Sequence, residues 1–263
     1  AYMGLIRQID DQLAVLFRFL DEEGLTDKTM IVFTSDHGDY LGDHWLGEKE
    51  LFHDMSVKIP LIVVDPAAEA NATRGTVSEA IVEAIDLAPT FLEFFGGQPK
   101  PHVLEGRSLM PLLHGETPAW RGHAISECDY AMRKARTDHG QSVADSRMFM
   151  VFDGRWKYVH AEGMRPMLHD LETDPEEFVD LGADPAFEAE RERLEEALST
   201  WSRRLHGRIT MADDAIAART GGELRAGILI GYWDEEEVAA ARLEQGDGPP
   251  MSARTTTPWN SSP

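Results

Sequence analysis

An apolar run near position 30 ends at a carboxylate and an imidazole. Residues 30–35 read Met-Ile-Val-Phe-Thr-Ser, and Asp36 and His37 follow directly. Carboxylate oxygen and imidazole nitrogen are ligands for divalent cations, and the next residue, Gly38, lets the backbone turn sharply. The two side chains therefore predict part of a divalent-metal site. A strand-end Asp that shapes a turn beside a surface His would produce the same dipeptide, so this alternative stays open.

The elements that must position these residues can be inferred from the spacing of apolar side chains. Buried strands of parallel α/β sheets are short apolar runs, and ligands bind beyond their carboxyl ends. Before the strand, apolar residues between Leu5 and Leu20 recur mostly at intervals of three and four, which predicts a helix with one apolar face that stops at Gly24. A second aliphatic strand follows over residues 59–64. The pattern predicts helix, strand, site loop and strand in that order.

The loop between the two strands carries further polar side chains in a recognisable order. From Gly38 to Lys49 it reads Gly-Asp-Tyr-Leu-Gly-Asp-His-Trp-Leu-Gly-Glu-Lys, and Pro60 opens the next strand. This order resembles the formylglycine-dependent sulfatases and phosphonate monoester hydrolases of the alkaline phosphatase superfamily. Asp-Leu-Ala-Pro-Thr at 86–90 and the Leu-His-Asp-Leu and Asp-Pro-Glu-Glu segments within 168–177 fit the same family. The resemblance covers roughly residues 1–205.

The resemblance implies a role for individual residues of this loop. Asp36 and His37 would bind one divalent metal ion, with Mn, Ca or Mg expected ahead of zinc. Lys49 would contact the anionic oxygens of the ester and so serve in both catalysis and substrate binding. His44 is a further candidate for substrate binding, although loop histidines are mostly solvated.

The nucleophile that the family uses is not in this sequence. In the family it is a hydrated formylglycine formed within a Cys-x-Pro-x-Arg motif, whereas the single cysteine here, Cys128, lies in Ser-Glu-Cys-Asp-Tyr. The motif and an early Asp-rich strand would both precede Ala1. We therefore expect the 263 residues to be the C-terminal part of a longer enzyme, and the chain alone to be inactive.

The resemblance implies hydrolysis of phosphonate monoesters and phosphodiesters, with sulfate esters as a further substrate class. His37 stands where sulfatases commonly have Asn, which favours the phosphonate monoester and phosphodiester hydrolases. Three alternatives stay open: an arylsulfatase, a two-zinc phosphodiesterase of the same superfamily, and a non-catalytic remnant that acts in oligomerisation.

Strand and helix patterns predict three parts of the chain. The resemblance implies that residues 1–122 are the C-terminal part of an α/β domain of the alkaline phosphatase type, with a mostly parallel sheet flanked by helices, and the sequence pattern adds a short strand near 77–82. Residues 123–206 predict a small antiparallel sheet of four strands followed by a helix rich in Glu and Arg. Residues 207–263 would be an extended tail whose Pro-, Ser- and Thr-rich end is disordered. The four predicted strands are 124–128, 148–152, 156–159 and 167–171.

Composition limits the partners and the compartment. The formal net charge is -22 at pH 7, and the Lys and Arg clusters needed to bind nucleic acid or anionic lipid are absent. No apolar run approaches the ~20 residues that span a bilayer. We therefore expect a small anionic ester as substrate, with no nucleic acid and no membrane as partner. The single cysteine excludes an internal disulfide framework and favours the cytoplasm.

The tail contains a conspicuously apolar segment over residues 226–233. Such a segment needs a surface to cover, either its own domain or another subunit. Because the tail resembles the C-terminal arms of phosphonate monoester hydrolases, which reach toward neighbouring protomers, we expect a homo-oligomer formed through it.

Overall fold

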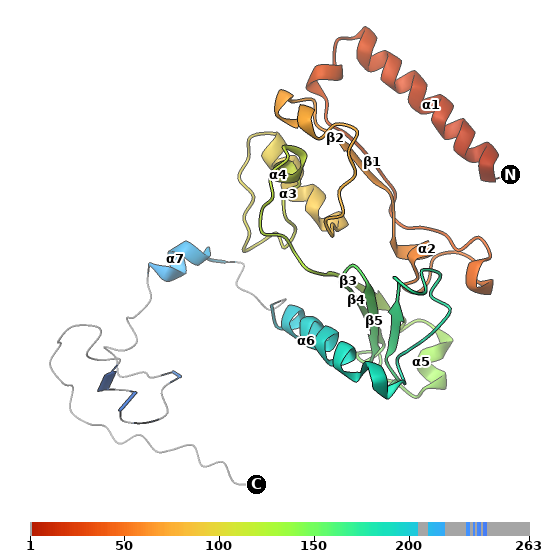
Figure 1. The fold of residues 1–263 in the computed structure, drawn as a ribbon, viewed down its shortest axis with the longest axis vertical. Helices are drawn as coiled ribbons and strands as arrows, with labels where there is room; N and C mark the ends of the chain where they lie inside the picture. The colour runs from red at the N-terminus through yellow and green to blue at the C-terminus, as the bar shows by residue number, and fades with distance from the viewer. Residues whose placement is uncertain are drawn as a thin grey trace. The chain divides into compact units, whose positions relative to one another are not determined.

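The computed structural model describes residues 2–204, 210–218, 230–231, 234, 236–237 and 239–240. Contacts within the chain define two compact units, Ala1–Gly207 and Arg208–Pro263. The first unit contains all described strands (Figure 1). In the second, the described residues include the short helix α7 (Asp213–Ala217). Most of the apolar segment 226–233 lies outside the described residues, so its role in assembly stays a prediction.

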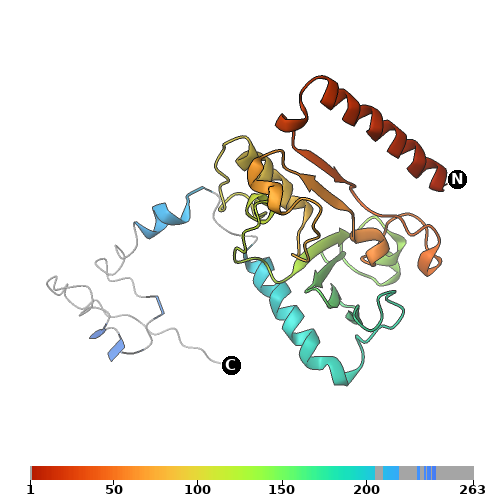
Figure 2. The same ribbon diagram turned by 45° about the horizontal axis from the view of Figure 1, so that its top comes forward.

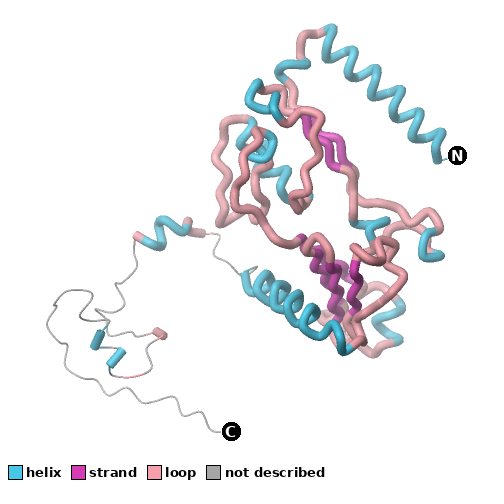
Figure 3. Tube along the Cα trace, in the orientation of Figure 1, coloured by secondary structure: helices cyan, strands magenta, loops and turns pink. Residues whose placement is uncertain are grey.

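The first part of the chain forms a mixed α/β region (Figures 1 and 3). Its 21-residue helix α1 and its two strands occur where the apolar spacing predicts them. The short 3-10 helices are η1 (Thr26–Lys28), η2 (Asp43–Trp45), η3 (Ala68–Ala72) and η4 (Ala84–Asp86). The longer elements are α1 (Tyr2–Glu22), β1 (Ile31–Thr34), α2 (Asp54–Val57), β2 (Leu61–Val64), α3 (Leu87–Phe94) and α4 (Met110–Leu113).

Strands β1 and β2 pair in an antiparallel register, with Ile31 opposite Val64 and Thr34 opposite Leu61. The α/β class is confirmed, but this pair does not have the parallel arrangement that we expected for most of the sheet. The physical reason is that the connection over residues 35–60 turns the chain back on itself, which permits an antiparallel partner. The expected strand near 77–82 is absent, because these residues have no partner strand and the Ile81 carbonyl accepts a hydrogen bond from Trp120 Nε1 instead, at 2.7 Å.

The second part forms the predicted four-stranded antiparallel sheet in the order β3-β4-β5-β6. Alternation places Val151, Tyr158 and Leu168 on one face, where they form a buried core with Leu194 and Leu198 of the following helix. Figures 1 and 2 show this helix, α6, lying along the sheet. The bounds are β3 (Ala124–Asp129), α5 (Lys134–Asp138), β4 (Arg147–Phe152), β5 (Trp156–Ala161), β6 (Met167–Asp170), η5 (Pro185–Phe187) and α6 (Glu188–Arg204).

The other face of this small sheet is covered by the loop that follows β1. Phe52 is buried against Met150 of β4 and Val159 of β5. The chain thus passes from the end of β1 to the small sheet and back to β2, so the two regions meet at the loop that carries the predicted site.

Candidate functional site

Asp36 and His37 lie at the point where the chain leaves β1, and their position depends on a close backbone approach. The amide of Gly38 donates to the carbonyl of Ser56 at 2.8 Å. A Cβ atom at position 38 would lie 1.9 Å from the carbonyl oxygen of Met55. Only glycine fits here, because any side chain would overlap the Met55 carbonyl. Gly38 therefore allows the end of β1 to lie against α2 (Asp54–Val57).

The structure brings Asp36, His37 and Lys49 together around one ring nitrogen. His37 Nδ1 lies 2.7 Å from the carbonyl oxygen of Gly38 and donates its proton there. Nε2 is therefore the unprotonated nitrogen. The Lys49 ammonium donates to it at 2.8 Å, and Asp36 Oδ2 lies 3.4 Å from the same atom.

Asp36 and His37 fit a divalent cation as two of its ligands. A carbonyl that holds Nδ1 and leaves Nε2 unprotonated is the arrangement typical of metal-binding histidines. The Lys49 ammonium occupies Nε2 here, and it would have to move aside for an ion to bind that nitrogen. The side chain of Asp36 is 86% exposed, so its oxygens are open to a ligand. Within the part of the chain that the structure describes, no group of three or more His, Cys, Asp or Glu residues could hold a metal ion. Further ligands would have to come from elsewhere.

The loop that carries Lys49 has a strained backbone. Ordinary residues adopt a left-handed conformation at Leu41, His44, Trp45, Glu48 and Leu51, with φ between 50° and 73°. Such conformations cost roughly 1–3 kcal/mol each, persist only where surrounding contacts impose them, and cluster at functional sites.

His44 lies in an aromatic cluster on the side of the loop that faces the small sheet. Its ring stacks on His53 at a centroid distance of 4.1 Å and contacts Phe178 at 4.9 Å. No contact between His44 and Lys49 is among the contacts of the described residues. The structure therefore groups His44 with structural neighbours, and its role in substrate binding stays a prediction.

Tyr40, to which sequence analysis gave no role, lies in this cluster with His53. Burial, reinforced by the nearby His44, lowers the pKa of His53 to about 4, and burial raises the pKa of Tyr40 to about 12. At neutral pH the phenol is therefore protonated and the imidazole is neutral. The Tyr40 hydroxyl donates to His53 Nδ1 at 2.7 Å.

A buried ion cluster lies beside these rings and was also missed by sequence analysis. The Lys157 ammonium lies 2.6 Å from Asp54 Oδ1 and 2.7 Å from Glu177 Oε1. The available signal was Lys157 itself, because alternation along β5 (Trp156–Ala161) places it on the same face as the buried Val159. A charge at such a position needs partners.

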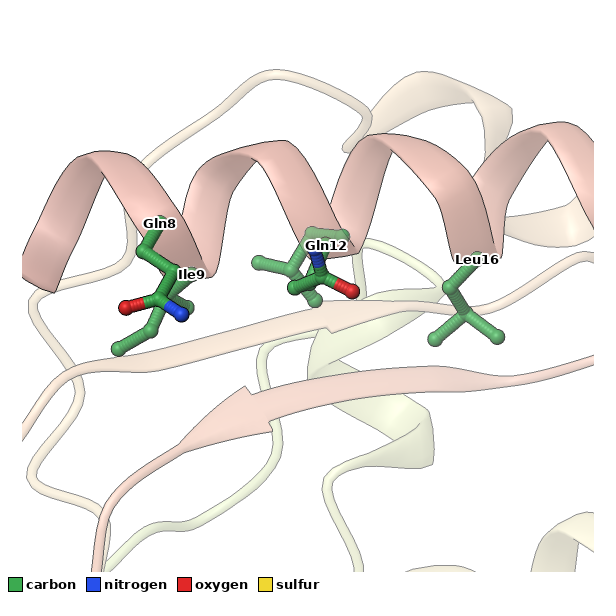
Figure 4. A pocket seen from close by; sticks show the side chains of 5 residues that line it. Gln8, Ile9, Gln12 and Leu16 are labelled. Carbon is green, nitrogen blue, oxygen red and sulfur yellow. The ribbon is translucent and has the colours of Figure 1, made fainter.

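Two surface depressions of the described residues are lined by residues other than Asp36, His37 and Lys49. One lies along α1, where Ile9, Gln12 and Leu16 project from one side of the helix (Figure 4). Another is lined by residues that include Thr26, Asp27 and Arg74. The side chains of Asp36 and Lys49 are exposed in this chain. Among the helices of the described part, none combines the length and the apolar character that a membrane span requires.

Comparison with known proteins identifies what this chain is similar to. Residues 42–204 match the family described as N-sulphoglucosamine sulphohydrolase, C-terminal. The chain is 41% identical over 205 residues to the multifunctional alkaline phosphatase superfamily protein PehA of Trinickia caryophylli, covering 75% of this chain and 39% of PehA. It is 34% identical over 184 residues to arylsulfatase K of Xenopus laevis, covering 68% and 33% of the two proteins.

Two solved structures show the same relationship. The phosphonate monoester hydrolase of Agrobacterium radiobacter superposes with a TM-score of 0.71 at 35% identity, covering 76% of this chain and 40% of that one. The phosphonate monoester hydrolase of Silicibacter pomeroyi gives a TM-score of 0.68 at 32% identity, covering 77% and 40%. The chain therefore spans two fifths or less of the length of these relatives.

Proposed function

Because the chain belongs to the sulfatase family, we propose that the protein containing it is a metal-dependent hydrolase of phosphonate monoesters and phosphodiesters, with sulfate esters as a further substrate class. The observation that carries this proposal is the convergence of Asp36 and the Lys49 ammonium on His37 Nε2. An oxygen donor, a nitrogen donor and a fixed cation within hydrogen-bond range suit an anionic ester.

Asp36 and His37 would hold the divalent ion together with ligands from the rest of the enzyme, and the sulfatase resemblance implies Mn, Ca or Mg ahead of zinc. When bound, the ion would lower the pKa of a coordinated hydroxyl and stabilise charge on the ester oxygens. Hydrogen bonding of Nδ1 to the Gly38 carbonyl keeps the His37 ring in the tautomer that can bind.

Lys49 supplies a fixed positive charge next to these donors. Its ammonium is exposed and lies at His37 Nε2, so an anionic group bound to a metal held by Asp36 and His37 would come within its reach. A positioned cation stabilises negative charge that develops on the ester oxygens in the transition state. It also offsets locally the acidic surface of a chain with a net charge of -22.

Residues of this chain do not provide the nucleophile. Burial raises the pKa of the Cys128 thiol, which makes the reactive thiolate scarce at neutral pH. The proposed nucleophile is the formylglycine that the sulfatase resemblance implies, supplied outside this sequence.

Two lines of support favour phosphoryl esters over sulfate esters. PehA is 41% identical, and the phosphonate monoester hydrolase structures are 35% and 32% identical to this chain. His37 also stands at a position where sulfatases commonly have Asn. An arylsulfatase is the second candidate, favoured by the 34% identity to arylsulfatase K.

The test uses the full-length protein. We expect it to hydrolyse an aryl phosphonate monoester and an aryl phosphodiester faster than a matched aryl sulfate, to lose activity with a chelator, and to regain it with Mn, Ca or Mg. Asp36→Asn and Lys49→Ala should each lower kcat/KM by about 10² or more. Lys100→Ala, which removes an exposed lysine outside the loop, is the control. Near-parental rates in the first two variants would contradict the assignments, and faster sulfate turnover would favour the arylsulfatase.

We also propose that the enzyme is cytoplasmic and forms a homo-oligomer through the tail. The single cysteine and the apolar segment 226–233 support this. Light scattering of the protein with and without residues 207–263 should show a loss of oligomer on truncation, whereas an unchanged mass would contradict the role of the tail.

A further inference from the structure

The segment from Lys49 to Val57 is anchored to the small sheet as well as to the end of β1, which it contacts through Gly38. Phe52, three residues after Lys49, is 5% exposed and packs against Met150 and Val159 on the face of the sheet opposite α6. A buried aromatic side chain so close in sequence to Lys49 limits how far the lysine backbone can move.

The buried ion cluster adds a polar anchor next to the apolar one. The side chains of Lys157 and Glu177 are each 2% exposed, and both of their partners on the loop come from Asp54. Its carboxylate accepts from Lys157 at 2.6 Å, and its backbone amide donates to Glu177 Oε2 at 2.6 Å. Lys157 and Glu177 thus both contact Asp54, the first residue of α2 (Asp54–Val57).

Two contacts carry this restraint to Lys49 itself. Ser56, which is buried within α2, donates its hydroxyl to the Lys49 carbonyl at 2.5 Å. The second contact is an ion pair between Glu50 and Arg133, which follows β3. The backbone directly after Lys49 is therefore tied to the small-sheet region through α2 and Arg133.

The strained conformation of the loop explains why such ties matter. Left-handed residues at Glu48 and Leu51 flank Lys49, and strained backbone persists only where its surroundings impose it. Without the anchors, the loop would relax, and the ammonium would lose its fixed position at His37 Nε2.

We propose that Lys157 is a positioning residue of the hydrolase, which acts through Lys49 by fixing Asp54 and Glu177 beneath the loop. The inference rests on the proposed function and extends it: the small antiparallel sheet is the platform that places the substrate-binding cation. A purely structural Lys157 would stabilise the fold without any specific effect on Lys49.

The first experiment is a double-mutant cycle in the full-length enzyme. Lys157→Met keeps the length of the side chain and removes its charge, and we expect it to lower kcat/KM about 10-fold or more. In a Lys49→Ala background the same change should cost less than about 2-fold, because the group through which it acts is gone. Arg193→Met is the control, since it breaks an ion pair with Asp153 on the α6 side of the same sheet, and it should leave kcat/KM within about 2-fold.

Multiplicative effects of Lys157→Met and Lys49→Ala would overturn the inference. If Lys157→Met does not fold, Glu177→Gln replaces it in the cycle, because it removes the partner charge at nearly constant shape.

A second measurement is independent of activity. In the ¹⁵N spectrum of the folded chain, Lys49→Ala should move the resonance of His37 Nε2, because its hydrogen-bond donor is lost. Lys157→Met should move it in the same direction, whereas Arg193→Met should not. An unmoved resonance in Lys157→Met overturns the inference even if Lys49→Ala abolishes activity. If Lys49→Ala is fully active, the proposed function is wrong. In that case the His37 Nε2 resonance of Lys157→Met still tests whether Lys157 positions Lys49.

Discussion

The small sheet with α6 and the segment containing α1, β1 and β2 bury very different amounts of their apolar surface. Val151 and Leu168 of the small sheet are fully buried, and Leu194 of α6 completes the same core. In contrast, α1 has no buried residue, and large apolar side chains of α1 and β2 are exposed. Exposed examples are Leu5, Ile9, Leu16, Phe17 and Ile62.

The difference follows from how many neighbours each element has within the described residues. Four strands that follow one another in the sheet, and the helix that comes after them, bring their apolar faces together without distant partners. A two-stranded sheet is marginal unless something packs on it. We therefore expect the small-sheet region to supply most of the stability of the first unit, and the α1 face to contribute little.

The largest predicted loss of stability tests whether every part of the α/β region contributes little to the free energy of unfolding. Asp86 is fully buried and accepts hydrogen bonds from both terminal nitrogens of Arg121 and from the Arg107 amide. Asp86→Ala leaves the Arg121 charge buried without that partner, so the free energy of unfolding should fall by about 3–5 kcal/mol in urea titrations. Asp10→Ala on exposed α1 is the control. A small effect at Asp86 would mean that this region contributes no buried polar core.

The next prediction compares apolar truncations in the two regions. Leu168→Ala creates a cavity beside Val151 and Leu194 and should lower the free energy of unfolding by about 2–5 kcal/mol. Leu16→Ala, at a side chain that is 49% exposed, should cost less than about 1 kcal/mol. Both are measured by urea unfolding followed by circular dichroism, and equal losses would refute the contrast between the regions.

The loop that joins the two regions should respond to acid. The pKa of His53 falls from its ordinary 6.5 to about 4 on folding, through burial and the neighbouring His44. Below pH 6.5 the unfolded chain binds a proton that the folded chain does not, so stability should decline as the pH falls from about 6.5 to about 4, by on the order of 2 kcal/mol. The decline should shrink in His53→Asn and persist in His139→Asn. The same slope in both variants would assign it to other groups.

The smallest predicted changes in stability concern two exposed ion pairs, one in each region. Arg7 pairs with Asp11 on α1, and Lys134 pairs with Asp138 on α5, each with a spacing of four residues. Because both pairs are solvated, Arg7→Ala and Lys134→Ala should each change the free energy of unfolding by less than about 0.5 kcal/mol. A larger loss in only one region would show that surface charges also contribute to the difference.

The sequence by itself determined the elements and the local arrangement of the predicted site. Short apolar and aromatic runs bounded by turn residues predicted the four strands of the small sheet, and the three- and four-residue spacing predicted α1, because both signals lie in neighbouring residues. The adjacency of Asp36 and His37 at the end of β1 is likewise a local feature. Lys49 was assigned through the family resemblance; its ammonium lies 2.8 Å from His37 Nε2, and its role with an ester stays a prediction.

Only the tertiary structure decided the pairings between distant residues. The antiparallel register of β1 and β2, the stacking of His44 on His53, and the burial of Lys157 against Asp54 and Glu177 depend on contacts across many residues. Lys157 and Asp54 are 103 residues apart. Period and composition describe one segment at a time, whereas the partner of a buried charge or of a strand edge is selected by the free energy of the whole packed chain.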